Sequence, residues 1–190
     1  MEDLLKEIRA CQICRTQLPH APRPVLQASA NSRILIIGQA PGSAVHESGI
    51  PWQDASGNTL RNWLGVDKGQ FYDPGLFALV PMGFCYPGKG KTGDLPPRHE
   101  CAPAWHARLL TLMPSVQLTL LIGKYAQDAY LKGRTEKNLT ETVRRWEAYL
   151  PDKRLPLPHP SPLNFRWMSR NNWFEMQLIP ELRTIVSKII

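Results

Sequence analysis

The sequence predicts an α/β protein, a three-layer α/β/α sandwich built around a short, mainly four-stranded parallel sheet. Short apolar runs of strand length alternate with longer segments of helical periodicity, which is typical of consecutive βαβ units. The strand-like runs are mostly apolar, as expected for strands that helices cover on both faces. Gly or Pro follows each of these runs, so the chain turns where each strand ends.

Four strands are expected, each short and rich in Ile, Leu or Val. They cover Arg33–Ile37, Leu76–Val80, Val116–Ile122 and Leu155–Leu157. Right-handed crossovers join parallel strands of this kind. A ligand crevice should therefore lie at the carboxyl ends of the strands, where the loops after them meet.

Helices are expected between and around the strands. Ser56 is the expected N-cap of a helix that runs through Leu64 and ends at Gly65. The other helices are expected at Asp3–Ala10, His99–Leu112, Tyr125–Leu131, Leu139–Tyr149 and Trp173–Val186, and a loop at Thr16–Asn31. No repeat or linker divides the chain, so residues 1–190 should form a single domain.

Composition and charge narrow the function classes. A hydrophobic content of 43% in 190 residues is ordinary for a globular domain with a sizeable core. No apolar run approaches the ~20 residues of a membrane span, and the charged start is unlike a signal peptide. We therefore expect a cytoplasmic protein, with a monomer as the default. The net charge of +7 favours a polyanion such as nucleic acid, with a generally basic soluble protein as the alternative.

Two Gly- and Pro-built loops follow the first and fourth strands. They read Gly38-Gln39-Ala40-Pro41-Gly42 and His159-Pro160-Ser161-Pro162-Leu163. Both motifs resemble the signature loops of the uracil-DNA glycosylase superfamily. The segment 49–57 resembles one from its iron–sulfur branch, often called family 4, whereas His-Pro-Ser-Pro-Leu is the spelling of family 1. The resemblance implies a DNA glycosylase of base excision repair that flips out a damaged or deaminated base, uracil or a related one, and cleaves its N-glycosidic bond.

The same resemblance assigns roles within the two loops. Trp52 stands where the family uses a Phe that stacks on the flipped base, and packing in the core is the alternative for this side chain. His159 would donate a hydrogen bond to the departing base, on which negative charge develops. The substrate-binding residues implied are Gly38, Gln39, Ala40, Pro41, Gly42, Trp52 and His159.

The carboxylate that this reaction needs is missing from the first loop. Cleavage makes the sugar cation-like, so the site requires a group that stabilises the cation or positions water. Family 1 has an Asp at the position of Ala40, and family 4 has a Glu at the position of Gln39. We expect Asp54 or Gln39 to serve with His159 as catalytic residues. A turn or a helix N-cap is the alternative role for Asp54.

Two reserve candidates and one further departure from the family concern the same site. His46 and Glu47, which follow the first loop, are reserve candidates for the missing group. Members of the family commonly place an Asn after the second strand to recognise the pyrimidine edge. This chain has Val80-Pro81-Met82 there, so the identity of the base does not follow from the resemblance.

The chain has four cysteines, Cys11, Cys14, Cys85 and Cys101. Family 4 is similar, with a C-x2-C and a distant pair that together hold a [4Fe–4S] cluster. Four thiolates are a complete ligand set for a cubane cluster or for tetrahedral zinc, and disulfides are less expected in a cytosolic chain. The resemblance implies a structural iron–sulfur cluster, with zinc or four unligated thiols as alternatives.

The second motif leads into a loop that, in the family, inserts into the minor groove of DNA. An apolar side chain such as Leu163 would fill the gap that an extruded nucleotide leaves. Polar, aromatic and basic residues, Trp167 among them, continue this loop. The DNA-binding residues expected are Ser161, Pro162, Leu163, Asn164 and Arg166.

Three functions are therefore open. The first is a DNA glycosylase of this superfamily. The second is a nucleic-acid-binding module of the same fold without glycosylase activity, which the missing carboxylate and Asn motivate. The third is an enzyme of this fold that acts on a different modified base or on a free nucleoside.

Overall fold

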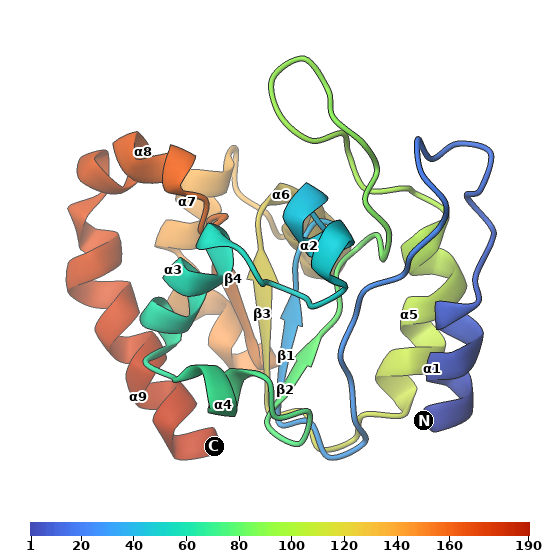
Figure 1. Ribbon diagram of the computed structural model, residues 1–190. Coiled ribbons are helices and arrows are strands. Elements are labelled where there is room, and N and C mark those ends of the chain that lie inside the picture. Colours follow the sequence, from blue (N-terminus) through green and yellow to red (C-terminus); the bar gives the residue numbers. More distant parts are fainter.

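The computed structural model describes residues 1–190 and has a four-stranded parallel sheet at its centre (Figure 1). The strands are β1 (Ile34–Ile37), β2 (Phe77–Leu79), β3 (Leu118–Ile122) and β4 (Arg154–Leu157). They lie in the order β2-β1-β3-β4, and every neighbouring pair is parallel. The predicted three-layer α/β/α fold is confirmed, and each predicted strand is present within two residues of its expected ends.

Helices cover both faces of the sheet because alternate strand residues point to opposite sides. Ile34 and Ile36 belong to one buried cluster, whereas Leu35 and Ile37 belong to the other. The first cluster includes α3 (Ala55–Leu64) and α9 (Ile179–Ile189). The second includes α1 (Glu2–Arg9), α5 (Cys101–Thr111) and α6 (Lys124–Leu131). Figure 1 shows these two groups of helices on either side of the strands.

The prediction that Ser56 is the N-cap of α3 was wrong, and the cap is Asp54. The helix begins at Ala55, and the carboxylate of Asp54 accepts a hydrogen bond from the Gly57 N–H at 2.8 Å. Both Asp and Ser are favoured at this position, so local preference alone does not choose between them. The predicted end of the helix is confirmed, since Gly65 adopts a left-handed conformation with φ of 69°.

The C-terminal half is less regular than predicted. Helix α7 (Leu139–Arg144) stops early, and a 3₁₀ turn, Trp146–Asp152, continues to β4. A π-helical turn, Phe174–Leu178, precedes α9. Pro180, which lacks an N–H, lies just beyond this turn, so the normal α-helical hydrogen bonding is interrupted there. Four short elements were not predicted: α2 (Ser43–Ser48), α4 (Lys68–Phe71), a 3₁₀ turn at Pro162–Asn164 and α8 (Phe165–Arg170).

Connections from the two central strands leave toward opposite faces of the sheet. The chain passes from β1 to α3 on one face and from β3 to α6 on the other. Neighbouring strands with this property open a crevice at their carboxyl ends. The segment Thr16–Asn31 has no helix or named strand, as expected, and only Gln27 pairs with β2. None of the helices combines the length and apolar character needed to cross a bilayer.

Candidate active site

A cavity of about 420 Å³ opens at the carboxyl ends of the strands, between the two signature loops. Backbone hydrogen bonds hold the first loop in place, because the N–H groups of Met82 and Gly83 donate to the carbonyls of Gly38 and Gln39 at 2.9 and 3.0 Å. Residues from both motifs line this cavity: Gly38, Gln39, Ala40, Pro41, Gly42, His159, Ser161 and Leu163. Trp52 and Asp54 line it too. The fold therefore brings all the expected catalytic and substrate-binding residues to one place.

Trp52 lines the cavity and has a strained backbone conformation. Its φ of 57° lies in the left-handed region, which costs a non-Gly residue about 1–3 kcal/mol. A methyl group at Gly38 would come within 2.8 Å of the indole ring, so this position requires glycine. The indole centroid is 5.9 Å from that of the His159 ring. Trp52 also packs against the hydrophobic core, so both roles expected for this side chain are compatible with its position.

Hydrogen bonds fix the orientation and the tautomer of His159. The Ser161 N–H donates to Nδ1 at 3.2 Å, which leaves the proton of the neutral ring on Nε2. Asn164 donates from Nδ2 to the His159 carbonyl at 2.8 Å. Burial lowers the pKa of His159, and the carboxylates of Asp54 and Asp94 oppose this effect. At neutral pH the site therefore offers a neutral imidazole whose Nε2–H can donate to a ligand.

Two carboxylates, not one, line the cavity. Asp54 faces it while capping α3, so its expected N-cap role is present alongside any chemical one. Asp94 reaches the cavity from the long loop after β2, which stands above the carboxyl ends of the strands in Figure 1. Sequence reasoning missed Asp94, because its loop has no periodicity and matches no motif. The reserve candidates His46 and Glu47 are not among the cavity-lining residues.

The segment after the second motif presents a large apolar side chain to solvent at the cavity rim. Leu163 is 85% exposed, and Phe165 and Arg166 are also exposed. Ser161 and Asn164 are half-buried, because their side chains stabilise the turn. Trp167, also expected in the DNA-facing loop, instead donates from Nε1 to Thr140 and packs against the core.

The four cysteines line one small apolar cavity, although their segments are far apart in the sequence. All four are free thiols. The Phe84 N–H donates to the sulfur of Cys101 at 3.3 Å. Burial raises the pKa of Cys85 to about 11 and that of Cys101 to about 12. No group of three or more His, Cys, Asp or Glu side chains has an arrangement that could hold a metal ion.

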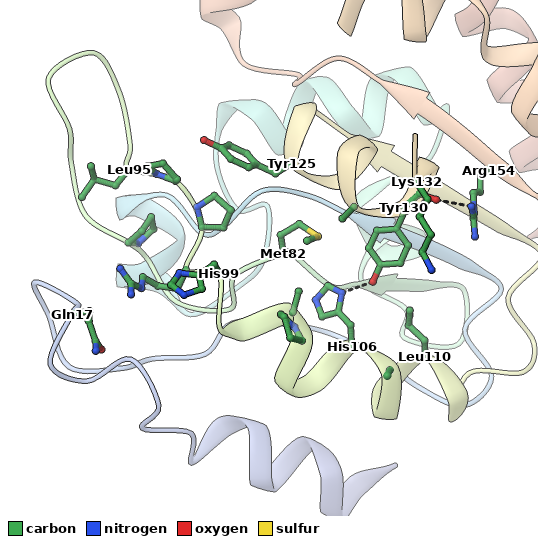
Figure 2. Close-up of a pocket in the computed structure, with 18 residues that line it drawn as sticks. Gln17, Met82, Leu95, His99, His106, Leu110, Tyr125, Tyr130, Lys132 and Arg154 are labelled. Atoms are coloured by element: carbon green, nitrogen blue, oxygen red, sulfur yellow. Dashed lines mark hydrogen bonds between the residues drawn. The ribbon is translucent and has the colours of Figure 1, made fainter. Parts of the chain in front are cut away.

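A larger cavity, of about 930 Å³, lies elsewhere, between α5 and α6 (Figure 2). Figure 2 shows the His106 and Tyr130 side chains next to one another in its wall, and their Nδ1 and Oη atoms are 2.5 Å apart. The other ring nitrogen of His106 is 3.0 Å from the Pro81 carbonyl, so both nitrogens have partners. This cavity contains no carboxylate and neither signature loop. We therefore assign the chemistry to the smaller cavity at the strand ends.

The fold and the cavity define an α/β protein with a cavity of small-molecule size at its topological switch point. The family model described as the uracil DNA glycosylase superfamily matches residues 26–183, which include both signature loops. The chain belongs to this superfamily, whose members act on DNA.

Proposed function

We propose that this protein is a DNA glycosylase that extrudes a damaged or deaminated base, uracil or a related one, and hydrolyses its N-glycosidic bond in base excision repair. The observation that carries the proposal is the cavity of about 420 Å³ that joins both signature loops, Trp52 and His159. Cavities of this size are typical of small-molecule sites. The net charge of +7 favours contact with DNA phosphates. We keep a monomer and a cytoplasmic location as predictions.

The site residues divide the chemical work among themselves. Trp52 would stack on the base, and the first loop would surround it. The Nε2–H of His159 would donate to the base oxygen on which negative charge develops, and such donors lower the barrier of bond cleavage. Asp54 or Gln39 would position the water that attacks the sugar. Leu163 would fill the gap left in the duplex, while Ser161, Pro162, Asn164 and Arg166 would contact DNA around it.

Base release from single-lesion oligonucleotides tests this proposal. The panel contains uracil, hypoxanthine and xanthine in duplex and single-stranded DNA, together with free deoxyuridine. We expect release from at least one DNA lesion, lowered about 10²–10³-fold in His159→Ala. His99→Ala, an exposed histidine outside the cavity, is the matched control. Salt-dependent DNA binding without release from any lesion would favour the binding module, and release from the nucleoside alone would favour the third function.

We also propose that Cys11, Cys14, Cys85 and Cys101 hold a structural [4Fe–4S] cluster. The donor set fits, because four thiols and no other ligand type line one apolar cavity. Four thiolates could also hold tetrahedral zinc, and the choice of a cluster rests on the resemblance to family 4. Bound to these residues, the cluster would tie the segment after α1 to α5.

Iron and sulfide content of protein purified without oxygen tests the cluster. We expect about four irons per chain and a broad visible absorption that Cys85→Ser and Cys101→Ser remove. The same variants should unfold at lower urea concentration than the loaded protein, because metal binding contributes to folding. Stoichiometric zinc without iron or sulfide would contradict the cluster and favour the zinc alternative.

A further inference from the structure

The proposed reaction needs negative charge close to the sugar. When the bond to the base breaks, positive charge develops on the sugar ring, and a nearby carboxylate lowers the energy of that state. Both cavity positions in the first loop that could have supplied an acid hold neutral side chains, Gln39 and Ala40. The charge must therefore come from another segment that reaches the cavity.

Asp94 lies beside the first loop, where both line the cavity. A methyl group built on Gly42 would be 3.4 Å from its Oδ2 atom, so this carboxylate oxygen faces the end of the loop. The other oxygen, Oδ1, accepts a hydrogen bond from the Tyr86 hydroxyl at 3.4 Å. Asp54 and His159 line the same cavity as Asp94, so both carboxylates share it with the imidazole.

The loop that carries Asp94 is a formed hairpin. Lys89 and Asp94 pair as an antiparallel bridge, and the Leu95 N–H donates to the Gly88 carbonyl at 2.8 Å. Gly88 has a φ of 102°, and a methyl group there would come within 2.8 Å of the Pro19 ring. Backbone pairing therefore forms the hairpin, the base of which lies close to Pro19, and the hairpin carries Asp94 to the cavity.

Asp54 is less free to act on the substrate. Its Oδ1 accepts the Gly57 N–H at 2.8 Å and caps the positive end of α3. That hydrogen bond must be kept for the helix to begin at Ala55. Asp94 caps no helix and is exposed at the cavity, so its carboxylate is accessible to a bound nucleotide.

We propose that Asp94, in place of Asp54 or Gln39, is the catalytic carboxylate that positions the water at this site, an inference that rests on the proposed glycosylase function. The carboxylate faces the sugar and accepts a hydrogen bond from the attacking water. As the bond between the sugar carbon and the base nitrogen breaks, its electron pair leaves with the base, which the Nε2–H of His159 stabilises. The water oxygen bonds to the sugar carbon, and the proton it loses passes to Asp94.

Single-turnover base release compares Asp94→Asn with Asp54→Asn on the lesion that the wild-type protein cleaves best. Both changes remove one negative charge at constant shape, and Asn can still cap α3. We expect Asp94→Asn to slow release by about 10²-fold or more, and at least tenfold more than Asp54→Asn does. Asp67→Asn, at the cap of α4 outside the cavity, controls for loss of charge and should match the wild type.

Binding of DNA that carries a sugar analogue provides a second readout. One duplex contains a pyrrolidine, whose protonated nitrogen mimics the cationic sugar, and the other contains a neutral tetrahydrofuran. Wild-type protein should prefer the cationic analogue by about tenfold or more, and Asp94→Asn should lose that preference. Unchanged thermal unfolding of the variant would show that it is folded.

The possible results separate the two proposals. A wild-type protein that cleaves while Asp94→Asn stays within threefold of it would overturn the role of Asp94 and leave the glycosylase function standing. Asp54→Asn losing more activity than Asp94→Asn would overturn it too and return the catalytic role to Asp54. A wild-type protein that cleaves no lesion and has no preference for the cationic analogue would overturn both.

Discussion

The position of Trp52 depends on Gly38 and Gly57, which have no side chain to clash with it. A methyl group at Gly57 would lie 1.8 Å from the Trp52 carbonyl oxygen. Alanine is favoured over glycine in a helix by about 1 kcal/mol, but relief of this clash requires movement of the backbone, which costs about 1–3 kcal/mol. We therefore expect Gly57→Ala to lower the free energy of unfolding, measured with urea. Thr59→Ala, two residues further along α3, should not, and a Gly57→Ala variant more stable than wild type would contradict the clash.

Asp54 allows its capping role to be measured apart from chemistry. Removal of an N-cap acceptor costs a helix about 1 kcal/mol, whereas Asn caps nearly as well as Asp. We expect Asp54→Ala to lower the free energy of unfolding by about that amount and Asp54→Asn to leave it within a few tenths of a kcal/mol. Thermal and urea unfolding of the two variants would check this. Equal stability of Asp54→Ala and wild type would show that the hydrogen bond to Gly57 contributes nothing.

The loop after β4 presents its apolar side chain where a duplex would meet the cavity. Leu163 is 85% exposed and Phe165, two residues later, is 59% exposed, so this loop presents two large apolar side chains. We expect Leu163→Ala to weaken base release from duplex DNA by roughly tenfold, with little effect on single-stranded DNA, where no stacked gap must be filled. Met176→Ala removes another exposed apolar side chain, in the π-helical turn Phe174–Leu178 outside the cavity, and should leave both substrates unaffected. Equal losses on the two substrates would contradict a wedge role.

Elements differed in how far the sequence determined them. The strands were predicted correctly because each is a short, mostly apolar run with Gly or Pro shortly after it. Helices α2 and α4 were missed because six and four residues are too short to give a helical period. The two sequence motifs predicted correctly that His159 and the first loop lie together at the carboxyl ends of the strands. Asp94 could not be foreseen, because it enters the cavity through a hairpin whose position depends on the tertiary fold.

His106, which is buried, and His46 and His159, which are half-buried, should make the whole molecule sensitive to acid. Burial lowers the pKa values of His46, His106 and His159, so the folded protein holds these rings neutral below the pH at which the unfolded chain protonates them. The unfolded chain then binds more protons, and stability is lost as the pH falls below about 6.5, by at most about 1.4 kcal/mol per pH unit for each ring. Lowered carboxyl pKa values, such as those of Glu7 and Glu100, act only at lower pH.

Urea unfolding at pH 7.5 and at pH 5.2 isolates this contribution, because the carboxyl groups remain mostly ionised over that range. We expect the wild-type protein to be less stable at pH 5.2. His106→Gln should be less stable than wild type at pH 7.5, since the Tyr130 hydroxyl loses its ring partner, but it should lose less on acidification. His99→Gln, which changes an exposed ring, should follow the wild type at both pH values. A wild-type protein equally stable at both would show that the folded state protonates these rings as readily as the unfolded chain does.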